Sequence, residues 1–450
     1  MSDYAAIEKE ARIFTEECVT NNRVDPALFG QYHIKRGLRD QDGKGVLAGI
    51  TNISRIDAFE ERDGQQVPCD GRLWYRGYNV YDLIRGLRGK RYAFEEAAYL
   101  LLLGDLPNEK QLESFKDCLA KCRDLPTNFV RDVIMKAPSK DLMNSLTRSV
   151  LTLASYDDDI GKSDLQTQLE QCIKLISVFP MLAVYGYHAY HYYECDGSMY
   201  IHRPKPELST AENLLQMLRP DRQYTDLEAH VLDIALLLHM EHGGGNNSTF
   251  ACRVLSSSAT DPYSAYAAAI GSLKGPRHGG ANAKVVSMHE DIRAHVSNWE
   301  DDDEVAAYLS KILDKQAFDG TGLIYGMGHA VYTLSDPRAE VCRHYARSLA
   351  AKKDLGEEFA LIERIERLAP QVMRDHGMAK PICANIDLYT GFIYKMLGVP
   401  ETLFTPMFAV ARMAGWSAHR MEELFCAHRI IRPAYRPVIE PLEYKPLADR

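Results

Sequence analysis

The residues best able to do chemistry lie in the segment from Gly326 to Arg338, which reads GMGHAVYTLSDPR. This segment places His329 among small residues and Arg338 nine positions later, just after an Asp-Pro turn. Small residues let a ligand approach the backbone, and Pro337 stiffens the chain where the arginine is presented. An arginine can fork onto a carboxylate while a histidine polarises an oxygen, so the pair predicts a site for an anionic carbonyl compound.

Further segments place polar side chains in glycine-rich breaks between apolar helices. They are residues 239–246 (HMEHGGGN), 275–282 (GPRHGGAN) and 384–391 (ANIDLYTG), with two arginines, Arg412 and Arg432, near the C-terminus. Each has an ordinary interpretation as well. His278 can bond to backbone at a helix start, Asp387 can cap a helix, and Arg412 can be a paired core arginine.

Two features raise the question of a metal site. His239 and His242 lie three residues apart with Glu241 between them, but the order is not HExxH and no cysteine-rich partner follows. Acidic runs occupy residues 157–159 and 301–304. The second run precedes an apolar helical stretch, where acidic charge complements the helix dipole. The sequence therefore favours a protein without a metal.

Composition excludes several classes of protein. The chain has 450 residues, 46% of them hydrophobic and 26% charged, and its net charge is −9. An acidic protein has little general affinity for nucleic acid or anionic membrane, although a local group of arginines can still bind small anions. The N-terminus has no apolar or arginine-rich leader, no apolar run reaches the length of a membrane span, and the ten cysteines form no CxxC pair. We expect a cytoplasmic protein.

The pattern of the chain predicts a mainly α-helical fold with a small β element near the N-terminus. Residues 1–30 are predicted to be helical, whereas residues 36–80 are rich in glycine and β-branched residues and should contain the only sheet. Beyond residue 80 the apolar spacing is helical. The best-marked helices are expected at residues 95–103, 141–155, 168–193, 225–240 and 262–273.

Taken together, the segments resemble the citrate synthase family from about residue 40 to residue 435. The matching stretches, in order, are LWYRGY (73–78), GPxHGGAN, GHAVYxxxDPR and N-x-D followed by Gly391. The resemblance implies a two-domain, multi-helical fold. A large, dimer-forming domain would comprise residues 1–279 and 395–450, and a small domain, residues 280–394, would carry CoA-binding and catalytic residues.

The resemblance also implies the activity: an acyltransferase that condenses acetyl-CoA with oxaloacetate and hydrolyses citryl-CoA to citrate, as in the tricarboxylic acid cycle. No metal or prosthetic cofactor is implied. Asp387 would remove the methyl proton of acetyl-CoA. His278 would donate to the thioester oxygen as a neutral imidazole, and His329 would hydrogen-bond the oxaloacetate carbonyl and protonate the forming alkoxide.

The implied substrate contacts divide into two groups. Arg338, Arg412 and Arg432 would bind the carboxylates of oxaloacetate with help from His242, and Arg432 would come from the neighbouring subunit of a homodimer. CoA would contact the backbone of Gly326, Met327 and Gly328, with the basic residues Arg277 and Arg36 as candidates for its phosphates. Position 333 departs from the family because threonine stands where many members carry a basic residue.

Three alternatives stay open at this stage. A 2-methylcitrate synthase, which uses propionyl-CoA, differs by one methylene, worth only about 1–3 kcal/mol in an apolar pocket, so polar motifs do not decide between the two. A catalytically inactive relative that senses CoA or a dicarboxylate is a second alternative. A zinc hydrolase that uses His239 and His242 is the third.

Overall fold

The computed structural model describes residues 4–40, 45–276, 278–426 and 429–449. The chain divides into two compact units, residues 1–50 and residues 51–450. The first unit contains helix α1 (Tyr4–Asn21), helix α2 (Ala27–Gln31) and the 3-10 turn η1 (Arg36–Leu38). The predicted helical character of residues 1–30 is thereby confirmed.

One small antiparallel sheet lies at the start of the second unit, with strands in the order β1 (Ser54–Arg62), β2 (Gln65–Tyr75) and β3 (Tyr78–Asn79). Asp63 and Gly64 join the first two strands, and both have positive φ (53° and 76°), as a tight type I′ hairpin requires. The sheet begins later than the sequence suggested. Residues 46–51 form no strand in the described structure. The first strand, β1, starts at Ser54 and pairs with β2.

The rest of the second unit is helical, which confirms a mainly α fold. Before residue 240 the elements are α3 (Val80–Gly86), α4 (Ala93–Leu103), α5 (Glu109–Cys122), the π turn η2 (Val130–Ile134), α6 (Leu142–Ala154), α7 (Leu165–Glu194), α8 (Thr210–Leu218) and α9 (Asp226–His239). The five best-marked helices of the sequence end within about three residues of their predicted limits. Helix α9 starts where expected because Thr225 and Glu228 form a capping box.

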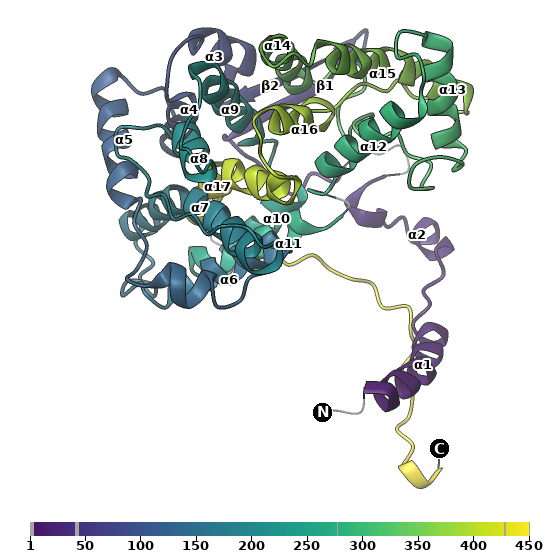
Figure 1. Cartoon of the computed structure of the whole chain (residues 1–450). Coiled ribbons are helices and arrows are strands. Elements are labelled where there is room, and N and C mark those ends of the chain that lie inside the picture. The colour runs from purple at the N-terminus through teal and green to yellow at the C-terminus, as the bar shows by residue number, and fades with distance from the viewer. Residues whose placement is uncertain (1–3, 41–44, 277, 427–428, 450) are drawn as a thin grey trace. The chain divides into compact units, whose positions relative to one another are not determined.

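The later helices bring the polar segments together. They are α10 (Asn247–Ser257), α11 (Pro262–Lys274), α12 (Ala281–His295), α13 (Asp302–Leu313), α14 (Pro337–Lys352), α15 (Gly356–Asp375), α16 (Asp387–Met396), the 3-10 turn η3 (Glu401–Leu403), α17 (Phe404–Cys426) and the 3-10 turn η4 (Leu447–Asp449). Helix α17 packs against α4, α7, α9, α10 and α11, so it runs through the main core (Figure 1). A second hydrophobic cluster joins α12, α13 and α15.

Helix α7 qualifies the expectation that no segment could span a membrane. It is long and apolar enough by composition, with a mean hydropathy of 1.3 over its best window. However, 83% of that window is buried inside the protein, as in the core helix of a globular fold.

Candidate active site

The glycine-rich start of the 326–338 segment is held against the chain that precedes α16. Met327 pairs with Ala384 in an isolated antiparallel bridge. Gly326 and Gly328 have φ values of 82° and 89°, which only glycine adopts without strain. A Cβ on Gly326 would also lie 2.9 Å from the Cδ1 of Leu388 in α16. The glycines therefore allow the close approach of two segments that are distant in sequence.

Asn385 fixes the relative position of these two segments. Its Nδ2 donates to the carbonyl oxygen of Gly328 at 2.8 Å, and its Oδ1 accepts from the backbone N–H of Asp387 at 3.0 Å. One side chain thus ties the residue before His329 to the first residue of α16. The asparagine of the N-x-D pattern is a positioning residue.

The hydrogen bonds of His329 indicate which nitrogen of its neutral ring carries the proton. Its Nδ1 accepts hydrogen bonds from the N–H groups of Val331 (3.0 Å) and Tyr332 (3.1 Å). A backbone N–H can only donate, so the proton of the neutral ring lies on Nε2. Nη2 of Arg338 lies 3.3 Å from this Nε2. Two donors therefore converge on one point, where an acceptor oxygen of a ligand would bind to both.

Arg338 is held rigidly at the start of α14. Asp336 caps the helix by accepting from the N–H of Arg338 (3.0 Å), and it also accepts from the guanidinium Nε (3.0 Å) and Nη2 (2.7 Å). Both residues are buried. Burial opposes the arginine's charge, but the carboxylate of Asp336 outweighs it and raises the pKa of Arg338 above its usual value.

Arg412 is a buried guanidinium that the fold satisfies only in part. It is fully buried on α17, and its Nε donates to the carbonyl oxygen of His239 at 2.7 Å. Its Nη1 and Nη2 find no hydrogen-bond partner among the described residues. Burial lowers the pKa of Arg412 to about 10, although the charge of Glu241 acts in the opposite direction. Leaving such donors unpaired is costly, so they are suited to receive an anion.

Asp387 is the first residue of α16, and burial raises the pKa of its carboxyl to about 6. The charge of Arg338 partly offsets this effect, and that of Asp336 adds to it. The capping alternative is not supported, because the N–H groups of Tyr389 and Thr390 donate to the carbonyl oxygen of Ile386 and not to Asp387. A carboxylate with a pKa near neutrality is suited to accept a proton.

His278 is half-buried and is anchored through one ring nitrogen. Its Nε2 lies 3.1 Å from Oδ1 of Asn246 and 3.1 Å from Oγ of Ser248, and accepts from the N–H of Ser248 at 3.4 Å. This nitrogen thus faces both an amide oxygen, which can only accept, and a backbone N–H, which can only donate. Burial, aided by the charge of Arg412, lowers the pKa of His278 to about 4, so the ring is neutral at neutral pH.

The remaining polar residues gather around the end of α9. The ring of His242 is buried with its centroid 5.0 Å from that of His329. Phe408, which sequence analysis missed, packs against His239 (4.6 Å between centroids), the guanidinium of Arg412 (4.7 Å) and His278 (6.3 Å). An aromatic residue in a helical apolar stripe gives no signal of such a position.

The structure therefore unites most, not all, of the predicted site. His242, His278, His329, Arg338, Arg412 and Asp387 interact with one another by contact or charge. Arg432 is exposed in the extended segment after α17. Arg36 is exposed in the first unit, where its guanidinium lies 5.8 Å from the ring of Phe29. Arg277 lies outside the described residues.

No group of three or more potential metal-ligating side chains occurs in the described part of the chain. Burial lowers the pKa of His239 and of His242 well below the usual value, and Arg338 adds to this effect. The cationic surroundings of these histidines disfavour a metal cation. The acidic run at residue 301 caps α13, where Asp301 accepts from two backbone N–H groups, as the sequence indicated.

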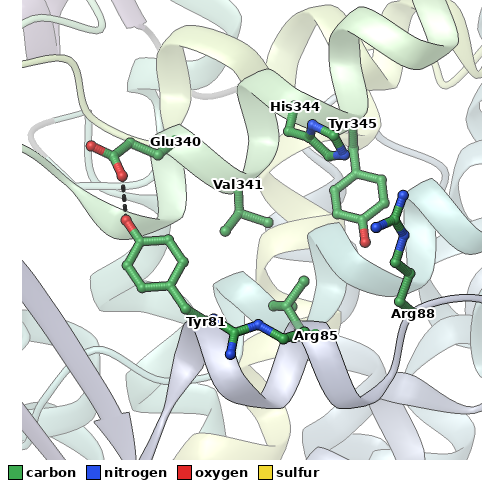
Figure 2. A pocket seen from close by; sticks show the side chains of 8 residues that line it. Tyr81, Arg85, Arg88, Glu340, Val341, His344 and Tyr345 are labelled. Carbon is green, nitrogen blue, oxygen red and sulfur yellow. Dashed lines mark hydrogen bonds between the residues drawn. The ribbon is translucent and has the colours of Figure 1, made fainter.

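A surface cavity of about 300 Å³ between α3 and α14 is separate from these residues. Figure 2 shows Tyr81 and Arg85 of α3 facing Glu340, Val341 and His344 of α14. Tyr81 donates a hydrogen bond to Glu340, two residues beyond Arg338. The cavity thus lies where α3 packs against α14.

Comparison with known proteins gives a consistent result. A family model described as citrate synthase, C-terminal domain, matches residues 38–434. The chain is 33% identical over 409 residues to the citrate synthase of Synechocystis sp., covering 90% of this chain and 92% of that protein. It is 31% identical over 408 residues to the 2-methylcitrate synthase of Shewanella oneidensis, covering 90% and 97%. Its fold matches a Thermoplasma acidophilum citrate synthase, solved with carboxymethyl coenzyme A and oxaloacetate, at a TM-score of 0.75 and 27% identity over 92% of this chain and 98% of that one.

Proposed function

The chain belongs to the citrate synthase family, and from this premise we propose that it condenses acetyl-CoA with oxaloacetate and hydrolyses the resulting citryl-CoA to citrate and CoA. The family is one of acyltransferases. The observation that carries the choice of oxaloacetate is the pair of unpaired guanidinium nitrogens on Arg412. No described residue provides an acceptor for them, and a carboxylate can bind both of them at once.

Oxaloacetate would provide the acceptors that the donors of the site lack. One carboxylate binds Arg412 and the other binds Arg338, whose guanidinium is already aligned by Asp336. The ketone oxygen accepts from Nε2–H of His329, which polarises the carbonyl and delivers its proton as the alkoxide forms. His242 adds a hydrogen bond from the end of α9. Convergence of two buried cations and a neutral imidazole suits a 2-keto dicarboxylate.

The acyl partner would be activated between Asp387 and His278. The carboxylate of Asp387 removes a methyl proton from the thioester while the neutral imidazole of His278 donates a hydrogen bond to the enolate oxygen. Burial supports both roles, since it makes the carboxylate a stronger base and keeps the imidazole uncharged. The enolate carbon then attacks the oxaloacetate carbonyl, and water hydrolyses the thioester.

The acyl specificity is tested by steady-state kinetics with oxaloacetate and either acetyl-CoA or propionyl-CoA. We expect kcat/KM to be about 10- to 200-fold higher for acetyl-CoA, the range that one methylene confers in an apolar pocket. A preference for propionyl-CoA would make the protein a 2-methylcitrate synthase. Absence of CoA release with either thioester would instead identify an inactive relative.

The acid limb of the pH profile tests Asp387 as the base. The pKa of its carboxyl is raised to about 6, so the active, ionised form predominates above this pH and is lost as the pH falls. We expect kcat/KM for acetyl-CoA to fall about tenfold for each pH unit below the pKa and to be level above it. A midpoint near the ordinary value for aspartate would contradict this assignment.

We further propose a homodimer in which Arg432 enters the partner's site. The segment after α17 is extended and exposes large apolar side chains, among them Ile430, Tyr435, Ile439 and Leu442. Exposed apolar surface of this kind is typical of a protein interface. Arg432 lies within this segment and not with the other substrate-binding residues, as an arginine donated to a second copy would.

Complementation between two inactive variants tests this arrangement. R432A and D387N are each expected to be nearly inactive as homodimers. In a hybrid dimer one site combines Asp387 of one chain with Arg432 of the other, so co-refolded variants should regain activity. A mixture that stays inactive while hybrid dimers form would show that Arg432 serves its own chain or no site at all.

The two-domain division and the CoA contacts extend the proposal. The second hydrophobic cluster, Met288 to Met373, lies wholly within residues 280–394 and supports a small domain there. The CoA contacts proposed at Gly326, Met327 and Gly328 lie on a segment whose N–H groups at Met327 and Gly328 already donate to the carbonyl oxygens of Ile324 (3.3 Å) and Cys383 (2.8 Å). The hydroxyl of Thr333 is buried without a partner among the described residues, and it provides no positive charge for a phosphate.

A further inference from the structure

A buried line of hydrogen bonds runs from α10, through α17, to the residue beside His242. Nη1 of Arg253 lies 2.9 Å from Nδ1 of His419, and Nε2 of His419 lies 2.9 Å from Oε1 of Glu241. The side chains of His419 and Glu241 are completely buried. None of these three residues is among those assigned to substrate above.

Arg253 sets the direction of this line. A guanidinium can only donate, so Nδ1 of His419 must be the acceptor and the ring proton lies on Nε2, which donates to Glu241. Without the arginine, His419 is free to carry its proton on Nδ1, where Oε2 of Glu422 lies 3.9 Å away. That tautomer would present a lone pair to the carboxylate of Glu241, which repels it.

Glu241 connects these hydrogen bonds to the substrate site. Its Oε1 also accepts from Oγ of Ser54 at 2.8 Å and from the N–H of Gly243, so it bends the chain around His242. Its carbonyl oxygen accepts from the hydroxyl of Tyr75 at 3.1 Å. The second carboxylate oxygen, Oε2, reaches α17, where a Cβ on Gly415 would lie only 2.8 Å from it.

The same carboxylate is the countercharge of Arg412. Burial alone would favour its neutral form, but His419 and Arg412 lower the pKa of Glu241, so it stays charged. It thereby stabilises a guanidinium whose two Nη atoms have no protein acceptor among the described residues. Movement of Glu241 would disturb both His242 and Arg412.

We propose that Arg253 is a positioning residue for oxaloacetate, which acts through the tautomer of His419 and the orientation of Glu241 on His242 and Arg412. The inference rests on the proposed function of this site. Arg253 touches no substrate. Nη1 of Arg253 also donates to Glu422 at 2.8 Å, and Nη2 lies 2.9 Å from the carboxylate of Glu423. Both contacts hold the guanidinium in place against α17.

The test compares three variants by steady-state kinetics and by calorimetric titration with oxaloacetate alone. R253M is expected to raise KM and Kd for oxaloacetate about tenfold, the effect of one lost hydrogen bond to a charged group, while KM for acetyl-CoA changes less than twofold. R253K keeps the charge but offers a point donor, which its two carboxylate partners would capture, so KM should rise at least about threefold. E423Q loosens the same arginine without touching the line to Glu241, and its KM should stay at the wild-type value.

The outcomes separate this inference from the proposed function. Wild-type protein that neither binds oxaloacetate nor releases CoA would overturn the function itself. Wild-type binding with an unchanged KM in R253M would overturn the positioning role, as would an equal rise in E423Q, which indicates general loosening. If R253M does not fold, R253K decides, because its retained charge protects the fold and an unchanged KM would still refute the inference.

Discussion

Replacing Asp387 with asparagine is expected to lower kcat by about 10²–10⁴-fold, the usual contribution of a general base. Asparagine keeps the size of the side chain but cannot accept the methyl proton. The carboxyl hydrogen-bonds no described residue, so the helix start should survive, because Asn385 still bonds the backbone N–H. Thiol release from acetyl-CoA measures kcat, and calorimetry should show oxaloacetate affinity within about threefold of wild type.

Stability gives an independent check of this prediction. A carboxyl whose pKa is raised by burial binds its proton more tightly in the folded state, so its ionisation destabilises the fold above that pKa. D387N should therefore unfold at a higher temperature than wild type at pH 7.5. D226N is the matched control, because Asp226 is an exposed carboxylate that also begins a helix, and both its kcat and its Tm should change little. Turnover retained by D387N would exclude Asp387 as the base.

The catalytic candidates could be predicted from the sequence because they are polar, reactive side chains in breaks between apolar helices. His278, His329 and Asp387 stand in glycine-rich breaks. The glycines there mark either a positive φ, as at Gly328, or a contact too close for a Cβ, as at Gly279 and Gly391. Helices α4, α6, α7, α9 and α11 were predictable because their apolar residues follow the helical period. The limits of these helices depend on local sequence, so one amino-acid sequence is enough to predict them.

The residues that position these side chains could not be predicted, because their role depends on the folded arrangement. Phe408 and Tyr332 are ordinary apolar positions until the fold places them against His278 and His329. Asp336 reads as part of a turn, and only the structure shows that it both caps α14 and aligns Arg338. The contact between Phe408 and His278 joins segments far apart in sequence, and the bonds from Asp336 to Arg338 depend on side-chain orientation, so spacing alone indicates neither.

The charges of the site explain why its two arginines differ. Arg338 is bonded by the carboxylate of Asp336 and is fixed before any substrate binds. Arg412 has a carboxylate nearby, Glu241, but does not hydrogen-bond it, and among the described residues its acceptor is the carbonyl of His239 alone. The fold thus buries two guanidinium nitrogens for which no described residue provides a hydrogen-bond acceptor, as expected of a group kept for a ligand.

This reasoning predicts that R412Q will raise the KM and Kd for oxaloacetate about 100-fold or more, since the loss of a buried charged partner typically costs 2–5 kcal/mol. Glutamine can still donate to the carbonyl of His239 but provides no charge. Because two buried donors without an acceptor among the described residues are removed, the Tm should stay the same or rise. Calorimetric titration with oxaloacetate and thermal unfolding without ligand measure the two effects.

Arg420 provides the matched control, since it is also buried on α17, two turns further along the helix. Its Nη1 donates to Ser256 at 3.1 Å, and its Nη2 donates to Gln168 and to the carbonyl of Thr260, so both nitrogens are already engaged by the protein. R420Q should therefore lower the stability by about 1–3 kcal/mol and leave KM for oxaloacetate unchanged. The opposite pattern, with R412Q destabilised and still binding oxaloacetate, would show that Arg412 is a core residue and that the carboxylate receptor lies elsewhere.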